Sequence, residues 1–446
     1  MAGRFRLFIV GAAMTALIAP GTANALTSTP ASSWQTNGRV RAIAIAGGKI
    51  FIGGDFTRVR APGSSGGGVV RNHLAALSLT TGRVMPWHPR ANGTVTALRA
   101  NAAGTTMYIG GGFTRINGFS RAHVAAVTTS GSALRKWHAN TNGTVYAIAV
   151  SARRVYVGGS FTAVKGARRV RLAAIGNTSS AVLAPWHPNA NSTVRALTMS
   201  PGGKRIFAGG DFSRVNGFVR PHLAALWVAG GLSRFAARPT WTVSALRTAG
   251  RHLVAGGGGN GGHVALYAST NGARRWLAVT DGDVQGVAVS GSSVIVGGHF
   301  NNFCIGGDGH GDPLVCNNPM TRRKLLALSL SEGVPTGWDP DVVGSPIGVS
   351  AVAAGGGGAQ AGGAFTKVHG VNQQGFALFC NGRTWRTGNC GAGLEFSATG
   401  GICQCQSQFN SPYTLRPCIN VGNPNWGGVK TNTCSGPTQT ITITFN

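Results

Sequence analysis

The sequence predicts an all-β protein, a seven-bladed β-propeller followed by a small disulfide-rich β appendage. One pattern repeats about every 50 residues, which is the length of a propeller blade. Glycine accounts for 71 of 446 residues and charged residues for only 11%, while strand-forming residues recur throughout. We expect a signal peptide over 1–25, the propeller over 26–380 and a Cys-rich module over 381–446.

The first segment has the pattern of an export signal. Arg4 and Arg6 precede an apolar run over 7–19, and Ala23-Asn24-Ala25 forms an A-x-A cleavage site. The run is shorter than the roughly 20 apolar residues that span a bilayer, and no later segment predicts a transmembrane helix. We therefore expect an extracellular monomer, free or associated with the cell surface.

Each repeat reads V-x-A-[IL], then a strand ending in G-G-x-F, then R-x-x-[LV]-A-A, then a strand ending in Trp. The opening valines are Val40, Val95, Val145, Val194, Val243, Val284 and Val349. Alternation in V-x-A places Val and Ala on one face of a strand, and Phe and Trp fill the space between twisted sheets. The turn at 256–259 has lost its Phe, and Phe235 replaces one Trp. A β-solenoid is the alternative, although its repeats are usually shorter.

Ring closure also leaves a trace in the sequence. Trp34 precedes the first opening valine, where only the end of a preceding blade is expected. We therefore predict that residues about 28–37 complete the last blade and cover its edge. Trp385 could occupy the same place, and the sequence leaves both alternatives open.

Three segments carry a family resemblance: Tyr156–Thr162 (YVGGSFT), Phe207–Ser213 (FAGGDFS) and Arg220–Leu226 (RPHLAAL). They resemble the delta-60-type repeats of bacterial propellers, within the broad kelch-like group. The resemblance covers residues 30–380 and implies an extracellular or surface-associated propeller. It implies no family-wide catalytic residue.

The charge balance points to acidic partners. Lys plus Arg number 40 against 10 for Asp plus Glu, a net charge of +30 that attracts polyanions. The connections after G-G-x-F and after Trp emerge on one face, so arginines there are the ligand-binding candidates. They are Arg58, Arg71, Arg115, Arg121, Arg168, Arg169, Arg171, Arg214 and Arg220. The alternatives are that these arginines cap loop carbonyls, or that they reflect a biased genome.

Most carboxylates lie between residues 281 and 341 and are expected on the same face. Such a cluster suggests a Ca²⁺ site, because carboxylate oxygens without cationic partners repel one another. The candidate ligands are Asp281, Asp283, Asp308, Asp312, Asp339 and Asp341. Solvated loops that use Asp as a turn former are the alternative, and no other cofactor is expected.

The cysteines favour disulfides in an oxidising compartment. All 8 lie at or beyond Cys304; Cys304 and Cys316 are expected to close a loop, and the other six belong to the tail. Zinc is the alternative, but no C-x2-C pair is present. Six cysteines allow 15 pairings, which the sequence leaves open.

No matched nucleophile and base are apparent, so we interpret the chain as a binding or structural module. Its expected partner is an acidic glycan, an envelope polymer or another surface protein, with no specific nucleic acid. The alternative is a hydrolase or lyase acting on an acidic polysaccharide through Asp283 or Asp341. Two histidine trios occupy equivalent repeat positions, which favours packing over metal ligation: His73, His123 and His222, and His88, His138 and His187.

The export signal predicts the mature N-terminus. When the full chain is expressed in a secreting bacterium, intact mass spectrometry of the exported protein should show that cleavage follows Ala25. Retention of residues 1–25 on exported material would contradict the prediction.

Overall fold

The computed structural model describes residues 26–380 except 65, 135, 306–315 and 317, together with four strands of the tail. All regular elements in these ranges are β-strands, which confirms the all-β class. No helix in this part of the chain is long and apolar enough to cross a membrane. The tail strands pair as two hairpins, β35 (Leu394–Thr399) with β36 (Ile402–Ser407) and β37 (Lys430–Ser435) with β38 (Thr440–Phe445).

The first four repeats each form an antiparallel sheet of three strands. These are β2 (Val40–Ala46), β3 (Lys49–Gly54) and β6 (Leu74–Ser78); β7 (Val95–Ala100), β8 (Thr106–Gly111) and β11 (Val124–Thr128); β12 (Val145–Val150), β13 (Arg154–Gly159) and β16 (Leu172–Gly176); and β17 (Val194–Met199), β18 (Arg205–Gly210) and β21 (Leu223–Trp227). In each of these sheets an isolated β-bridge, such as the one between Leu77 and Val84, lies at the outer edge, where a fourth strand would pair.

Three further sheets follow in chain order. The fifth sheet consists of β22 (Thr242–Ala249), β23 (His252–Gly259), β24 (Gly261–Ala268) and β25 (Arg274–Thr280), and it is extended by β28 (Asn302–Cys304) and β29 (Pro319–Thr321). The sixth consists of β26 (Val284–Ser290), β27 (Ser293–Gly298) and β30 (Leu325–Ser329). The seventh consists of β31 (Val342–Gly355), β32 (Gly358–Val368) and β34 (Phe376–Cys380), and β33 (Val371–Asn372) also pairs with β32. Cys304 and Cys316 form the predicted disulfide.

Short hairpins project between the second and third strands of most sheets. They are β4 (Arg58–Arg60) with β5 (Val69–Val70), flanked by β1 (Gln35–Thr36); β9 (Arg115–Ile116) with β10 (Phe119–Ser120); β14 (Ala163–Val164) with β15 (Ala167–Arg168); and β19 (Arg214–Val215) with β20 (Phe218–Val219). These hairpins carry four of the nine arginines predicted to bind a ligand: Arg58, Arg115, Arg168 and Arg214.

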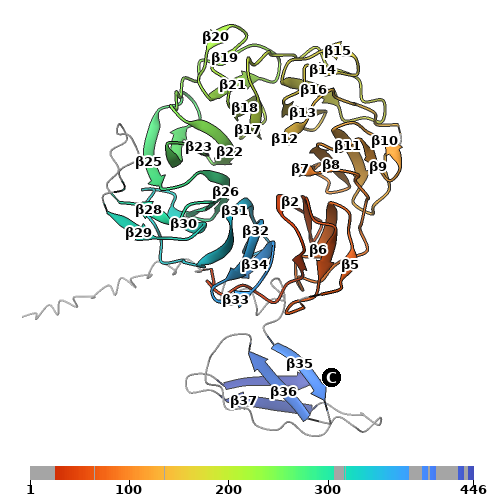
Figure 1. Ribbon diagram of the computed structural model, residues 1–446, viewed down its shortest axis with the longest axis vertical. Helices are drawn as coiled ribbons and strands as arrows, with labels where there is room; N and C mark the ends of the chain where they lie inside the picture. Colours follow the sequence, from red (N-terminus) through yellow and green to blue (C-terminus); the bar gives the residue numbers. More distant parts are fainter. Residues whose placement is uncertain are drawn as a thin grey trace, which may run out of the picture.

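The sheets follow one another around a common axis, with each opening strand innermost (Figure 1). Each opening valine packs on the first glycine of the preceding G-G turn. A Cβ on Gly53 would lie 2.4 Å from Val95 Cγ1, and one on Gly209 would lie 2.4 Å from Val243 Cγ1. Only glycine fits there, so the repeated glycines are required by contact between sheets.

The two ends of the series meet. A Cβ on Gly362 of the last sheet would lie 2.5 Å from Val40 Cγ1 of the first. Ala31 pairs with Leu378, and its amide donates to the Leu378 carbonyl at 2.7 Å. The segment predicted to cover the last sheet therefore reaches its edge. Trp34 is half-buried near this edge, and Trp385 lies outside the described residues.

The strand-ending tryptophans link neighbouring sheets through their indole N–H groups. Trp87 donates to Thr128 O at 3.0 Å, Trp137 to Gly176 O at 2.9 Å and Trp186 to Trp227 O at 2.8 Å. Phe235, the predicted substitute for Trp, is fully buried and contacts Phe207 with ring centroids 5.2 Å apart. The predicted burial of the aromatic residues between sheets is confirmed at these positions.

The fifth sheet replaces its missing Phe with Trp241. A Cβ on Gly257 would lie 3.0 Å from the Trp241 ring, just as one on Gly111 would lie 3.1 Å from the Phe113 ring. Trp241 is 5% exposed and stacks on His263, with ring centroids 5.3 Å apart. The aromatic group thus comes from a position before the opening valine, which the repeat pattern does not reveal.

This substitution predicts a large stability cost at Trp241. Trp241→Ala should lower the free energy of unfolding by about 3–5 kcal/mol, because it removes a buried ring and leaves a cavity. Trp227, whose side chain is 42% exposed, provides the control, and Trp227→Ala should cost much less. Urea titration followed by far-UV circular dichroism measures both. Equal losses would show that Trp241 does not fill the place of the missing Phe.

Candidate functional site

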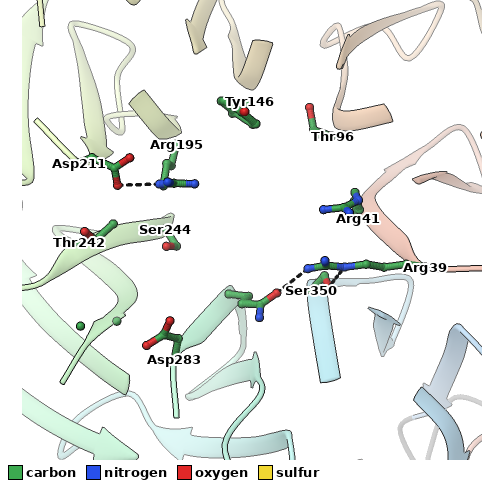
Figure 2. Close-up of a pocket in the computed structure, with 13 residues that line it drawn as sticks. Arg39, Arg41, Thr96, Tyr146, Arg195, Asp211, Thr242, Ser244, Asp283 and Ser350 are labelled. Atoms are coloured by element: carbon green, nitrogen blue, oxygen red, sulfur yellow. Dashed lines mark hydrogen bonds and ion pairs between the residues drawn. The ribbon is translucent and has the colours of Figure 1, made fainter. Parts of the chain in front are cut away.

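A polar pocket of about 560 Å³ lies where the inner strands begin (Figure 2). We call it the central pocket. It is lined by Arg39, Arg41, Thr96, Tyr146, Arg195, Asp211, Thr242, Ser244, Gly258, Gly259, Asp283, Gln285 and Ser350. Because the lining comes from all seven sheets, the pocket exists only when the sheets are assembled.

A β-bulge in each opening strand supplies most of the pocket lining. The register shifts between Val40 and Ala42, and again at the equivalent positions of the other six opening strands. The residue between them therefore has no partner in the ladder, and its side chain is redirected. These displaced residues are Arg41, Thr96, Tyr146, Arg195, Ser244, Gln285 and Ser350, all of which line the central pocket. They are the x of V-x-A, a position that our sequence analysis did not select.

Two arginines in the pocket are neutralised within their own sheets. Arg41 Nε lies 2.6 Å from Asp55 Oδ2, and Arg195 Nε lies 2.7 Å from Asp211 Oδ1. The hydrogen bond to Asp211 raises the pKa of Arg195. Both aspartates are the x of G-G-x-F. Such partly exposed pairs contribute about 1 kcal/mol or less to stability, so their main effect is to set the local charge and orientation.

Arg39 is held differently, by neutral groups. Its Nε donates to Ser350 Oγ at 2.7 Å and its Nη2 donates to Gln285 Oε1 at 2.8 Å. Burial, reinforced by the charge of Arg41 and opposed by Asp55, lowers the pKa of Arg39 to about 10. Arg39 remains a cation at neutral pH. It is oriented toward the pocket without a salt bridge to any described carboxylate.

Asp283 provides a third carboxylate from the opposite part of the lining. A Cβ on Gly258 would lie 1.9 Å from Asp283 Oδ1, so the carboxylate fills the place where other repeats carry the x of G-G-x-F. In the fifth sheet, to which Gly258 belongs, the bulged residue is Ser244, whereas the first and fourth sheets carry arginine at this position. The Asp283 carboxylate accordingly forms no salt bridge within the described part of the chain.

The predicted ligand-binding arginines divide into two groups. Arg58, Arg115 and Arg214 are exposed on the hairpins, and each donates to a carbonyl of its own hairpin, at 3.1, 3.0 and 2.9 Å. Arg168 is also exposed. We call these four the arginine fringe.

The remaining predicted arginines are largely enclosed and cap loop carbonyls. Arg71 and Arg121 are 9% and 6% exposed. The guanidinium groups donate hydrogen bonds to backbone carbonyls: Arg71 to those of Val70 and Met85, Arg121 to that of Ser120, Arg169 to those of Arg168 and Ala184, Arg171 to that of Ser160, and Arg220 to that of Val219. For this group the structure agrees with the capping alternative.

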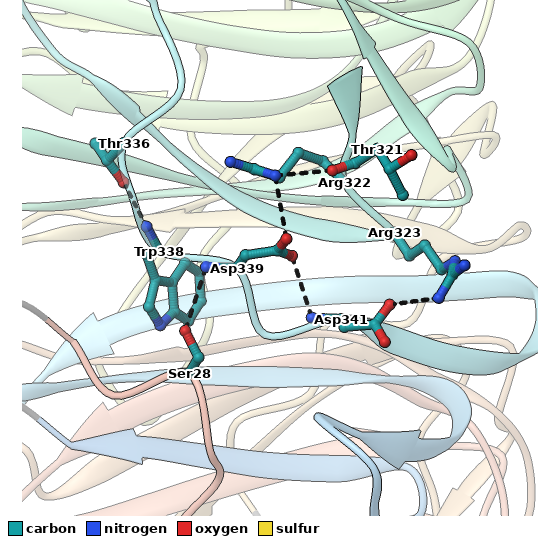
Figure 3. A network of polar contacts seen from close by, with 8 residues as sticks. All are labelled: Ser28, Thr321, Arg322, Arg323, Thr336, Trp338, Asp339 and Asp341. Carbon is teal, nitrogen blue, oxygen red and sulfur yellow. Dashed lines mark hydrogen bonds and ion pairs between the residues drawn. The ribbon is translucent and has the colours of Figure 1, made fainter. Parts of the chain in front are cut away.

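The structure does not gather the predicted Ca²⁺ ligands. Asp339 lies 3.1 Å from Arg322, and Asp341 lies 2.9 Å from Arg323 (Figure 3). Asp281 accepts from the amides of Asn301 and Asn302 at 2.8 and 2.9 Å. The assumption that these carboxylates lack cationic partners is therefore wrong for Asp339 and Asp341. Asp281 is held by neutral amides, and Asp283 belongs to the central pocket.

The last two candidate ligands, Asp308 and Asp312, lie outside the described residues. Within the described ranges, no three His, Cys, Asp or Glu side chains form a group that could hold a metal.

One histidine trio has a local backbone role. His73, His123 and His222 adopt positive φ angles of 66°, 65° and 59°. Each Nδ1 hydrogen bonds to the carbonyl of the second glycine in its G-G turn, at 3.0, 3.2 and 3.0 Å. Each histidine therefore bonds within its own sheet.

Among the comparisons with known proteins, one solved structure supports the fold. No family model and no curated protein matches the chain. The WD40 β-propeller domain of Doa1 is similar with a TM-score of 0.51 and 11% identity, over 80% of this chain and 97% of that chain. The computationally designed Ika8 protein matches with a TM-score of 0.46, 13% identity and coverage of 84% and 95%. U3-55K matches with a TM-score of 0.48, 11% identity and coverage of 79% and 99%. The likeness to the Doa1 domain, at 11% identity, shows the fold alone: the chain is a β-propeller.

Buried His263 gives a pH prediction. Burial lowers the pKa of His263, and its Nδ1 has no hydrogen-bond partner. The unfolded chain therefore binds this proton more readily, so stability should fall as the pH drops below about 6.5. His263→Phe should remove that part of the loss between pH 7 and 5, whereas the exposed control His187→Gln should retain it. Melting temperatures across this range provide the measurement, and parallel profiles for wild type and His263→Phe would contradict it.

Proposed function

We propose that this protein is a secreted or surface-associated binding module that holds an acidic sugar unit of a glycan or envelope polymer in the central pocket. The observation that carries the proposal is the state of Arg39. Its guanidinium is oriented by Ser350 and Gln285, which leave its positive charge uncompensated. A carboxylate or sulfate of a ligand would supply the missing charge and form charge-assisted hydrogen bonds.

A closed ring of seven blades is part of this proposal. It is supported by the contact between Gly362 and Val40 and by the pairing of Ala31 with Leu378. Closure matters for binding because the central pocket takes residues from the first and last sheets alike, Arg39 and Ser350 among them. Export is supported by the signal pattern at the N-terminus and by the disulfide between Cys304 and Cys316.

The rest of the lining suits a polyhydroxylated ligand. Thr96, Tyr146, Thr242 and Ser244 place hydroxyl groups around the pocket, and the Asp283 carboxylate can accept hydrogen bonds from sugar hydroxyls. The arginine fringe follows the second strand of its sheets, so the order of the strands places it on the same side as the pocket. The whole chain carries a net charge of +30, and the fringe would concentrate a polyanion near the pocket and favour rapid, salt-sensitive association.

We propose binding in preference to turnover. Glycoside hydrolysis generally employs two carboxyl groups, one of which exchanges a proton. In the pocket region Asp55 and Asp211 are held by Arg41 and Arg195, so Asp283 faces no second available carboxylate among the described residues. Of the carboxylates considered for the hydrolase or lyase alternative, Asp341 is paired with Arg323.

The test uses Arg39→Gln and the exposed control Arg238→Gln, which removes the same charge elsewhere. Calorimetric titration with polygalacturonate and heparin oligosaccharides should show wild-type binding that is weakened about tenfold in Arg39→Gln, equivalent to about 1.4 kcal/mol. Arg238→Gln should bind like wild type. A neutral dextran oligomer should bind much more weakly.

Three results would overturn the proposal. Equal weakening in both variants would mean that charge alone drives binding. Absence of binding to either acidic glycan would remove the ligand class. Shortening of the oligosaccharides during the titration, detected by mass spectrometry, would establish the enzymatic alternative.

A further inference from the structure

The residue directly before the opening valine is charged in only two of the seven repeats. Four repeats have threonine there and the seventh has glycine: Thr94, Thr144, Thr193, Thr242 and Gly348. The two charged residues are Arg39 in the first repeat and Asp283 in the sixth, and both line the central pocket (Figure 2). The same repeat position therefore gives one pocket a cation from one sheet and an anion from another.

The other charges of the pocket lining cancel in pairs. Arg41 and Arg195 are each held by an aspartate of their own sheet, at 2.6 and 2.7 Å. One guanidinium, that of Arg39, and one carboxylate, that of Asp283, remain unmatched in the lining. The pocket is thus close to electrically neutral, although the whole chain carries a net charge of +30. A ligand with negative charge alone would satisfy the guanidinium and leave the carboxylate unpaired, which costs free energy.

The Asp283 carboxylate is positioned by its neighbour but has no donor. Its Oδ1 lies against Gly258 of the fifth sheet, where an added Cβ would come within 1.9 Å. Over the described ranges the carboxylate accepts no hydrogen bond and forms no salt bridge, and neither oxygen is sealed from solvent. An ionised carboxylate only accepts hydrogen bonds, so both oxygens are available to a donor in the pocket.

Gln285 links the two charged positions. It lies two residues after Asp283, and its Oε1 accepts a hydrogen bond from Arg39 Nη2 at 2.8 Å. Its Nε2 donates to Ile347 O at 3.3 Å, which fixes the amide between the sixth and seventh sheets. At about 3.3 Å per residue, Asp283 and Gln285 are roughly 7 Å apart along the strand. One sugar ring with its substituents can span the space between the guanidinium that Gln285 holds and the carboxylate.

We propose that the acidic sugar unit bound in the central pocket also carries a protonated amino group, which makes the ligand a zwitterionic amino sugar. Its acidic group accepts from the Arg39 guanidinium, and its ammonium group donates to the Asp283 carboxylate. The inference rests on the proposed function, because it assigns a second group to the same ligand. It also gives a source of specificity, since a purely acidic sugar leaves Asp283 unpaired and binds less tightly.

The first test compares two ligands that differ in one group. Muramic acid carries a carboxylate and an amino group on one sugar, and in its analogue a hydroxyl replaces the amino group without adding bulk. Calorimetric titration of the wild-type chain at neutral pH should show that muramic acid binds at least about tenfold more tightly than the analogue. Glucosamine, which has the amino group alone, should also bind at least about tenfold more weakly than muramic acid.

The second test removes the carboxylate. Asp283→Asn keeps the shape of the side chain and loses its charge, so it should abolish the preference for muramic acid without weakening binding of the analogue. Glu332→Gln, at an exposed position, loses the same charge elsewhere and should keep the wild-type preference. Arg39→Gln should weaken both ligands, because both carry the carboxylate. Retention of the full preference in Asp283→Asn would contradict the inference.

The ligand comparison in wild type does not depend on any variant and separates the two proposals. If muramic acid and its analogue bind equally well, the inference fails and the proposed function stands, because an acidic sugar is still bound. If muramic acid fails to bind while polygalacturonate oligosaccharides bind, the same conclusion follows. If none of these acidic ligands binds, both proposals fail.

A last arm tests the sugar itself. γ-Aminobutyrate carries both charges without a ring, and it should bind at least about tenfold more weakly than muramic acid, because it makes no contacts with the hydroxyl groups of the lining. Equal affinity would mean that the pocket recognises the two charges alone, and the assignment to an amino sugar would be wrong.

Discussion

The packing of each opening valine on a glycine of the preceding sheet is the contact on which the rest of the structure depends. A side chain on Gly53 or Gly209 would overlap the next valine, so the inner strands approach closely only because these residues are glycines. The same contact joins Gly362 to Val40 and brings the last sheet against the first. No single sheet could bury these valines, which explains why the repeats require one another.

This close approach also determines where polar residues can lie. In a regular strand Val and Ala of V-x-A would share one face, as the sequence predicted. The bulge between them instead turns them to opposite faces, so that Val95 packs against the first sheet and Ala97 against the third. The residue x is displaced toward the axis. Position x is consequently free of packing demands, and the repeats fill it with Arg, Thr, Tyr, Ser and Gln. The scaffold is uniform while the pocket lining varies, as is suitable for a binding protein.

The charges near the axis follow a consistent rule with four exceptions. Where a bulge supplies arginine, as at Arg41 and Arg195, the same sheet supplies aspartate at the x of G-G-x-F. Arg39 and Asp283 depart from this rule because each precedes an opening valine, and Arg99 and Arg247 depart from it deeper in the ring. A sheltered charge without a partner favours a ligand of opposite sign, and the proposed function rests on one such cation, Arg39.

The sequence by itself determined the strand class, the repeat and the aromatic layer, because these follow from local alternation and from spacing along the chain. It also indicated that Ala31 and its neighbours reach the last sheet, since Trp34 stands before the first valine. Only the tertiary structure revealed the central pocket, because its residues come from different sheets and become neighbours when the inner strands surround the axis. The same reason explains the errors over Asp339 and Asp341, whose partners Arg322 and Arg323 lie in an adjoining loop. It also explains why the repeat pattern does not reveal that Trp241 takes the place of the missing Phe. Spacing along a chain predicts which residues share a strand, but contacts between sheets decide which charges meet.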